Sequence, residues 1–407
     1  MDERDLATLP GGSQSFEETF GERLRSILDV DSWVSGYDLP QIYEEVATQV
    51  EAAVRHESKV RASLRQTVFP LLESAQGAPR GAGTYRVTLD ELKRVHQGLL
   101  FNGAVEGCDS TQYTLETLPV SITQIGVGLV SYSGNQGTWT HRLYRRDLRE
   151  SWSDPAEEAI ALLERRSRRD AAAGPGNRDE LSRLARRAIA SYAERAILLY
   201  RSNALWRVGR GQPAPYELLT WSAGTLDIMI ESTKILERLI CDHQKFVFVP
   251  REVPDWLYRT LGAALDPLEF AIVGTLSETV DRLTREEQYY LPTSSDTTVD
   301  GRRLTPREWV QRFRDEIASR VVVGIYRTSE LAPAHLFYAH VDHAHEAAMV
   351  ALADSLLQPH RGFPTLLDVA RHLCEATFGQ DSLAAALQLG YSRAGVPLEY
   401  MSGRMPH

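Results

Sequence analysis

Apolar residues recur every three or four positions along residues 16–76, and Glu and Arg fill most of the positions between them. The clearest run is Ile42, Val46, Val50 and Val54. This spacing places the apolar side chains on one face of an α-helix. The Gly- and Pro-rich stretch 77–83 ends the pattern. We therefore predict a helical N-terminal extension over residues 1–83 and a second domain over residues 84–407.

A strand-like pattern begins at Gly103. Residues 103–111, 118–134 and 138–148 each carry such a run, and the second run is rich in β-branched residues. Turn-forming residues at 133–137 separate the second run from the third. Runs of this kind, bounded by Gly and Asn, are typical of adjacent strands. We predict three neighbouring strands of one sheet.

The rest of the chain alternates between helical and strand-like segments. Helical spacing after Ser153 predicts a helical insertion around residues 154–225, with an exposed loop at 171–177. Further helices are predicted at 226–243, 339–358 and 366–378, and buried strands at 246–250 and 320–329. Strands that alternate with helices indicate an α/β layer. We predict a mixed central sheet with helices on both faces.

Composition narrows the class of protein. The 407 residues are 43% hydrophobic and 25% charged, which excludes a disordered or collagen-like chain. Three scattered cysteines disfavour a disulfide framework or a zinc site. The net charge of -10 argues against a protein that coats nucleic acid, although it permits a local basic groove. No apolar run reaches the ~20 residues of a membrane span, and the acidic N-terminus is unlike a signal peptide, so we expect a cytoplasmic protein.

Several common catalytic motifs are absent. The chain has no GxxxxGK[ST], no GxGxxG after a strand, no HExxH and no GxSxG. A nucleotide-driven motor, a Rossmann dehydrogenase, a zincin and an α/β hydrolase therefore lose support. Carboxylate chemistry remains, and any step driven by ATP requires a partner protein.

The first candidate carboxylate is Asp109, in the run Cys108-Asp109-Ser110-Thr111. The pattern predicts that Asp109 ends the first strand, beside small hydroxyl residues that leave room for a hard divalent cation. Two such ions activate water and stabilise the leaving oxygen of a phosphodiester. The alternative is a simple polar turn. Glu106 has an odd offset from Asp109 and is expected on the opposite face of the strand.

Two runs resemble motifs of one nuclease family. GAVEGCDST, at residues 103–111, resembles the first motif of NurA-type nucleases, in which a hydrophobic strand ends in Asp-Gly-Ser or Asp-Gly-Thr. RGFPTLLDVARH, at residues 361–372, is similar to the closing motif, a Gly-Tyr-Pro followed by Leu and then by Ala-His on a helix. The resemblance implies a ribonuclease H-like fold, cleavage of DNA with Mn²⁺ or Mg²⁺, and a partnership with the hexameric HerA translocase.

The resemblance also implies roles for individual residues. Asp109 takes the place of the first metal ligand. In the closing motif Phe363 replaces a tyrosine, and Arg371 stands where a metal-contacting histidine is expected. Since arginine does not ligate a cation, that contact passes to another group or is lost. Asp368 and His372 share a face of the predicted helix and are candidates to compensate, and the alternative is a solvated surface helix.

The middle carboxylates are harder to place. In the family a helical Glu precedes, by roughly 17 residues, a strand that ends in Asp, and counting back from the strand at 246–250 reaches Glu231. Pro250 and Arg251 follow this strand, which leaves Glu252 as a displaced substitute. Glu217, near a predicted helix start, is a further candidate ligand. Its alternative role is to stabilise the N-terminus of that helix.

These observations favour a metal-dependent DNA nuclease that acts on single-stranded and linear duplex DNA as an endonuclease or exonuclease. The predicted catalytic residues are Asp109, Glu217, Glu231, Glu252 and His372, and the predicted metal ligands are Asp109, Glu231, Glu252, Asp368 and His372. We expect a homodimer and a HerA-like ATPase partner, in DNA end processing or antiphage defence. The main alternative is a catalytically eroded adaptor that assembles with or regulates the translocase. RNA stays open as a substrate because no base-reading module is visible.

Overall fold

The structure is a computed structural model that describes residues 13–33, 39–117, 120–145, 160, 175–219, 226–253, 255–285, 297–299, 302–304 and 306–398. The chain divides into two compact units, Met1–Ala62 and Ser63–His407. The first unit contains α1 (Ser13–Phe20), α2 (Leu24–Leu28) and nearly all of α3 (Leu39–Ser63), so its predicted helical character is confirmed. The predicted boundary after residue 83 stays a prediction.

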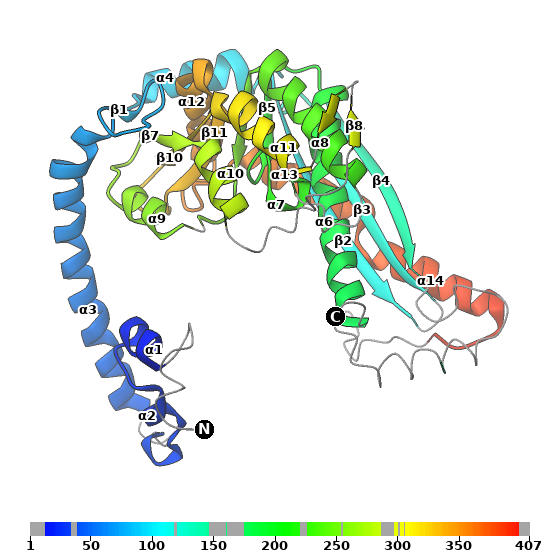
Figure 1. Cartoon of the computed structure of the whole chain (residues 1–407), viewed down its shortest axis with the longest axis horizontal. Coiled ribbons are helices and arrows are strands. Elements are labelled where there is room, and N and C mark those ends of the chain that lie inside the picture. The colour runs from blue at the N-terminus through cyan, green and yellow to red at the C-terminus, as the bar shows by residue number, and fades with distance from the viewer. Residues whose placement is uncertain are drawn as a thin grey trace. The chain divides into compact units, whose positions relative to one another are not determined.

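A nine-stranded sheet forms the centre of the second unit (Figure 1). Its strands are β1 (Gly83–Arg86), β2 (Val105–Glu116), β3 (Ser121–Val130), β4 (Gln136–Arg145), β5 (Trp206–Arg210), β6 (Phe246–Val249), β7 (Glu269–Thr275), β10 (Val321–Arg327) and β11 (His335–His340). They lie in the order β1-β7-β10-β11-β6-β5-β2-β3-β4, and β5 runs parallel to both β2 and β6. The predicted mixed α/β architecture is confirmed, whereas a ribonuclease H-like fold in particular stays a prediction.

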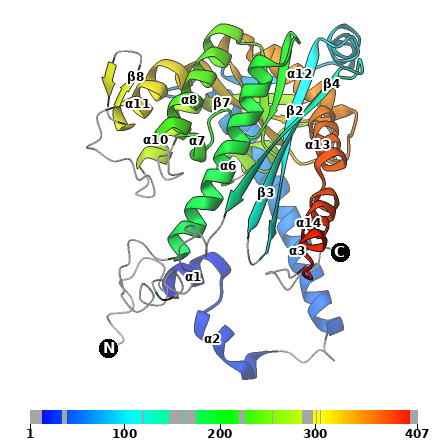
Figure 2. The same ribbon diagram turned by 90° about the vertical axis from the view of Figure 1, so that its right-hand side faces the viewer.

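Helices cover both faces of this sheet. They are α4 (Leu89–Val95), α6 (Pro175–Tyr200), α7 (Tyr216–Leu219), α8 (Leu226–Glu237), α9 (Trp256–Ala263), α10 (Leu276–Arg285), α11 (Pro306–Arg312), α12 (Ala344–Leu356), α13 (Thr365–Phe378) and α14 (Gln380–Ala394). One core cluster joins the sheet to α4, α12 and α13, and another joins it to α6 and α8–α11. Figure 2 shows α6 and α13 on opposite sides of β2 and β3. Of the described helices, none is both long enough and apolar enough to cross a bilayer.

Most of the predicted elements of the sheet layer are present. β2, β3, β4, β6 and β10 confirm the predicted strands, and α8 and α13 confirm two predicted helices. The helix predicted at 339–358 is wrong at its start, because residues up to His340 belong to β11 and α12 begins at Ala344. The predicted insertion at 154–225 stays a prediction, since 154–159, 161–174 and 220–225 lie outside the described residues. Residues 175–177 of the predicted loop form the first turn of α6.

Glycines let α13 lie directly on β2 and β3. A Cβ atom on Gly128 would lie 2.7 Å from the carbonyl oxygen of Ala370 and 2.9 Å from Sγ of Cys374. A Cβ atom on Gly107 would lie 2.7 Å from Cβ of Leu366. A larger residue at either position would force α13 away from the strands. The packing fixes α13 beside Asp109, which pairs with Gly128 across the sheet.

Candidate functional site

Asp109 lies in the middle of β2, so the prediction that it ends a strand is wrong. The strand continues for seven residues beyond it and pairs with β3 throughout. The polar residues after Asp109 remain extended because the sheet layers supply them with partners, as when the hydroxyl of Ser110 donates a hydrogen bond to Glu194. Asp109 is therefore fixed on a rigid element and is fully buried.

Two arginine side chains contact the carboxylate of Asp109. Arg210, the last residue of β5, donates to Oδ1 at 3.1 Å, and the guanidinium of Arg251 lies 3.5 Å from Oδ2. The backbone N–H of Ser110 donates to Oδ1 at 2.7 Å. Burial raises the pKa of Asp109, and the two arginines oppose this rise because they stabilise the charged form. Each carboxylate oxygen thus already faces a cation.

Asp368 on α13 is a second buried carboxylate of the same network. Arg251 lies 3.7 Å from it, and Arg361 contacts its two oxygens at 2.8 and 3.2 Å. Arg251 follows β6 by two residues, and its guanidinium lies within reach of both Asp109 and Asp368. The structure therefore brings two predicted ligands together, but through an arginine that joins them.

Glu194 on α6 is a buried carboxylate that the sequence reasoning missed. It accepts a hydrogen bond from Ser110 and pairs with Arg195 at 2.7 Å. Arg195 is itself buried and donates to the backbone carbonyls of Ser191, Arg210, Gln212 and Pro213. Burial raises the pKa of Glu194, and the charge of Asp109 raises it further. The two carboxyl groups are thus close enough to influence each other.

The spacing between Glu194 and Arg210 in the sequence could have identified Glu194 as a candidate. Glu194 lies sixteen residues before Arg210 at the end of β5, which fits the helix-then-strand interval that the resemblance implies. The sequence reasoning used β6 instead, because its uninterrupted apolar run FVFV is more conspicuous than WRVGR. On this spacing, Arg210 stands where the resemblance implies an aspartate.

Three other predicted residues do not contact Asp109. Glu231 is exposed on α8 and pairs with Lys234 of the same helix at 3.1 Å. Glu252 is exposed, and the residue before it faces the interior instead. His372 is exposed, and its Nδ1 donates to the backbone carbonyl of Asp368 at 2.7 Å. Each of these side chains lies on the solvent side of its element.

A pocket of about 410 Å³ opens beside the edge of β2, where that strand extends beyond the end of β5. Its polar lining includes Ser110, Thr111, Arg187, Glu194, Arg195, Arg210, Glu217 and Arg371. Glu217 is half-buried on α7 and accepts a hydrogen bond from Ser191 at 3.1 Å, and Arg371 pairs with Glu375 at 2.7 Å. α6 and α13 thus both contribute side chains to one polar pocket.

The residues around Asp109 do not fit a divalent cation. Hard cations take several carboxylate, carbonyl or water oxygens around a shared space. Within the described part of the chain, no group of three or more His, Cys, Asp and Glu side chains is placed to hold an ion. The oxygens of Asp109 face Arg210 and Arg251, so an ion there would lie beside two positive charges. The predicted ligand set is not assembled as a metal site.

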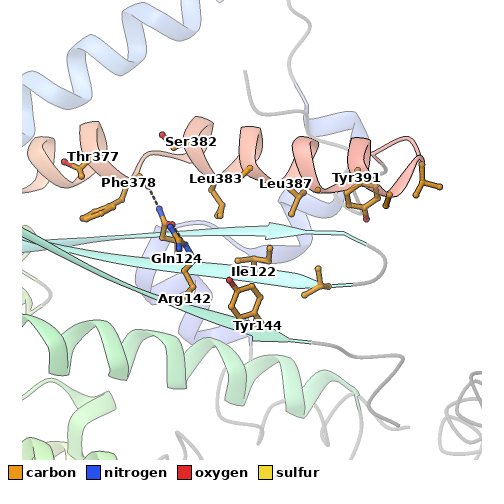
Figure 3. Close-up of a pocket in the computed structure, with 15 residues that line it drawn as sticks. Ile122, Gln124, Arg142, Tyr144, Thr377, Phe378, Ser382, Leu383, Leu387 and Tyr391 are labelled. Carbon is orange, nitrogen blue, oxygen red and sulfur yellow. Dashed lines mark hydrogen bonds between the residues drawn. The ribbon is translucent and has the colours of Figure 1, made fainter. Parts of the chain in front are cut away.

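A second pocket, of about 720 Å³, lies between α14 and strands β3 and β4 (Figure 3). Its lining is mainly apolar and includes Ile122, Phe378, Leu383 and Leu387. Gln124 accepts a hydrogen bond from Arg142 at 2.8 Å and donates one to the carbonyl of Phe378 at 3.0 Å. None of its lining residues is an Asp, Glu or His. This pocket therefore offers no carboxylate or imidazole group for catalysis or metal binding.

No protein-family model and no curated protein matches the sequence. The NurA nuclease from Sulfolobus solfataricus matches the structure with a TM-score of 0.42 at 8% identity, over 87% of this chain and 98% of that chain. A NurA structure bound to dAMP and manganese matches with a TM-score of 0.37 at 9% identity, over 87% and 98% of the two chains. Endonuclease V from Ciona intestinalis, in complex with DNA, matches with a TM-score of 0.23 at 8% identity, over 69% and 86%.

Proposed function

We propose that this chain is a non-cleaving subunit of the NurA type that binds DNA and works with a HerA-like hexameric ATPase. The observation that carries the proposal is the pairing of Asp109 with Arg210 and Arg251. A buried carboxylate that neutralises two guanidinium groups offers no free oxygen to a cation. In this proposal the chain keeps the sheet and helices around the strand of Asp109 but does not carry out metal-assisted hydrolysis.

The partner is proposed because the chain has no nucleotide-binding motif of its own. It lacks GxxxxGK[ST], so movement along DNA requires another protein to hydrolyse ATP. The two NurA-like motifs point to a HerA-like hexamer, and a homodimer of this chain would suit a symmetric ring. The adaptor would then act in the cytoplasm, in DNA end processing or antiphage defence.

A metal-dependent DNA nuclease is the second candidate. It is favoured by the two buried carboxyl groups of Asp109 and Glu194, each of which accepts a hydrogen bond from Ser110. Solved NurA structures include one with manganese and one with dAMP and manganese, so Mn²⁺ or Mg²⁺ is the cofactor to test. This candidate requires that Arg210 and Arg251 both leave Asp109.

Digestion of single-stranded and linear duplex DNA in Mn²⁺ separates the two candidates. The wild type is compared with Asp109→Ala and with Asp109→Asn, which keeps the shape of the side chain. We expect all three proteins to leave the DNA intact and to bind the ATPase equally well. A wild type that degrades DNA, together with two inert variants that still fold, would contradict the proposal and establish the nuclease.

A further inference from the structure

The pocket beside β2 has the hydrogen-bond donors of an anion site. Four arginines line it, Arg187, Arg195, Arg210 and Arg371, against two acids, Glu194 and Glu217. The guanidinium of Arg195 is already used by Glu194 and by backbone carbonyls. The side chain of Arg210 is 35% exposed and gives one N–H to Asp109, so further donors remain for a ligand in the pocket. Asp109 and Glu375 pair with Arg210 and Arg371 and offset their charges. The guanidinium of Arg187 and the unused N–H donors of Arg210 are therefore what favours an oxyanion.

Arg187 adds a guanidinium that other side chains leave available. It lies on α6, is exposed, and lines the pocket. Among the described residues it has no ion-pair partner. Guanidinium groups bind phosphate through two parallel hydrogen bonds, which gives direction as well as charge. Arg187 and Arg210 therefore supply such groups from two different elements of one pocket.

Thr111 adds a donor without a partner. It follows Ser110 on β2, lines the pocket and is 7% exposed. Its hydroxyl has no hydrogen-bond partner within the described structure. A buried hydroxyl without a partner costs free energy, and an oxygen atom of a ligand would satisfy it. This hydroxyl is the second, uncharged feature that distinguishes the pocket from a solvated basic surface.

The position of the pocket agrees with a ligand site. It opens at the carboxyl end of β5, which is parallel to both β2 and β6. In open α/β sheets ligands bind outside the carboxyl ends of parallel strands. A volume of about 410 Å³ is within the ~300–1,000 Å³ range of small-molecule sites, which is enough for one nucleotide.

We propose that this pocket binds a phosphate group of a DNA strand without a metal ion, through Arg187, Arg210 and the hydroxyl of Thr111. The inference rests on the proposed function, since it names the group that the non-cleaving site holds. The guanidinium groups supply the positive charge that a divalent cation would otherwise bring to the phosphate. The phosphate belongs either to a strand end or to an internal phosphodiester.

Fluorescence anisotropy with the full-length protein tests the proposal. The probes are 15-nucleotide DNA strands that carry a fluorophore at the 3′ end and either a phosphate or a hydroxyl at the 5′ end. Binding is measured with EDTA and with Mn²⁺ for the wild type, Arg187→Gln and Thr111→Val. Arg94→Gln, which removes an exposed arginine of α4 outside the pocket, is the matched control. Each sample is also run on a gel to detect cleavage.

We expect binding in EDTA that is as tight as binding in Mn²⁺. Loss of a charge-assisted hydrogen bond should weaken binding ~10-fold or more in Arg187→Gln, and loss of a neutral one ~5-fold in Thr111→Val. Arg94→Gln should bind within ~2-fold of the wild type because an exposed charge that makes no phosphate contact contributes little. Tighter binding of the 5′-phosphorylated strand assigns the site to a strand end, and equal binding assigns it to an internal phosphodiester.

Binding that requires Mn²⁺, or pocket variants that bind like Arg94→Gln, would overturn the proposal. A strand of RNA that binds more tightly than the DNA would overturn the choice of DNA. Cleavage on the gel bears only on the proposed function, so a failure of that function is recognised separately from a failure of phosphate binding.

Discussion

The substitution Asp354→Asn is predicted to remove a large part of the pH dependence of folding stability. Asp354 is fully buried on α12. Its carboxyl accepts a hydrogen bond from the hydroxyl of Tyr132 and another, at 3.1 Å, from the backbone N–H of Leu366 in the first turn of α13. Burial raises its pKa to about 7, against the opposing effect of these two hydrogen bonds.

The magnitude follows from the rise in pKa. A change from 3.8 to about 7 corresponds to ~4 kcal/mol, since one pKa unit is worth about 1.36 kcal/mol. The folded state favours the protonated form, so this contribution is fully present below pH ~4 and is lost as the pH rises through ~7. Asn is neutral at every pH, and its amide can donate to Tyr132 while its oxygen accepts from Leu366.

Urea unfolding at pH 5.5 and pH 8.5 measures this effect as a difference between the two proteins. Between these pH values the wild type should lose ~2 kcal/mol relative to Asp354→Asn. All other titrating groups are common to both proteins and cancel in the comparison. A difference in unfolding free energy that is the same at both pH values, or that moves in the opposite direction, would refute the reasoning.

Two further predictions concern packing and thiol accessibility. Gly128→Ala should destabilise the protein by ~1–3 kcal/mol in urea unfolding, because the new Cβ would meet the backbone of Ala370. A Cβ at Gly98 meets nothing within 4 Å, so the control Gly98→Ala should be neutral or stabilising. Equal losses of stability in both variants would contradict this account. Burial raises the pKa of all three thiols, that of Cys374 to about 12, but Cys108 and Cys374 are buried whereas Cys241 is half-buried. A disulfide reagent at pH 8 should therefore label Cys241 at least ~10-fold faster than the other two. Mass spectrometry that finds Cys374 labelled as fast as Cys241 would count against this prediction.

The elements that the sequence predicted correctly are those with a long local pattern. β2, β3 and β4 are runs of at least ten residues, and Gly134 and Asn135 lie in the turn between β3 and β4. α13 has an apolar face of regular spacing and follows Pro364. In α13 the local periodicity is also the pattern of burial, because this helix packs one face on the sheet. β2 and β3 are buried on both faces, and their length and apolar content made them recognisable.

The elements that were missed lack a local boundary or are short. β11 reads HLFYAH and passes through three residues into the Ala-rich α12, so one helical pattern was assigned across both. β5 has only five residues, two of them arginine. Because β5 was missed, the helix-then-strand interval was measured from β6, and Glu231 was chosen in place of Glu194.

The site itself depends on contacts that no local pattern contains. Glu194 and Arg195 are adjacent charges on a helix rich in Glu and Arg, which is the pattern of a solvated surface. Glu194 instead bonds to Ser110, which is 84 residues away in the sequence, and Arg195 bonds to backbone carbonyls that include those of Arg210, Gln212 and Pro213. Likewise, the end of β6 decides that Arg251 faces Asp109 and that Glu252 faces solvent. The sequence could therefore predict a carboxylate on the right strand, but not the arginines that pair with it.

Binding of Mn²⁺ to the full-length protein, followed by the electron paramagnetic resonance signal of the free ion, tests most directly whether arginines occupy the carboxylate of Asp109. We predict that the wild type and Asp109→Asn take up the same amount of Mn²⁺, and that only Arg210→Asp, which exchanges a guanidinium for a carboxylate at the end of β5, gains a bound ion. A wild type that binds one or two ions which Asp109→Asn does not bind would contradict the account.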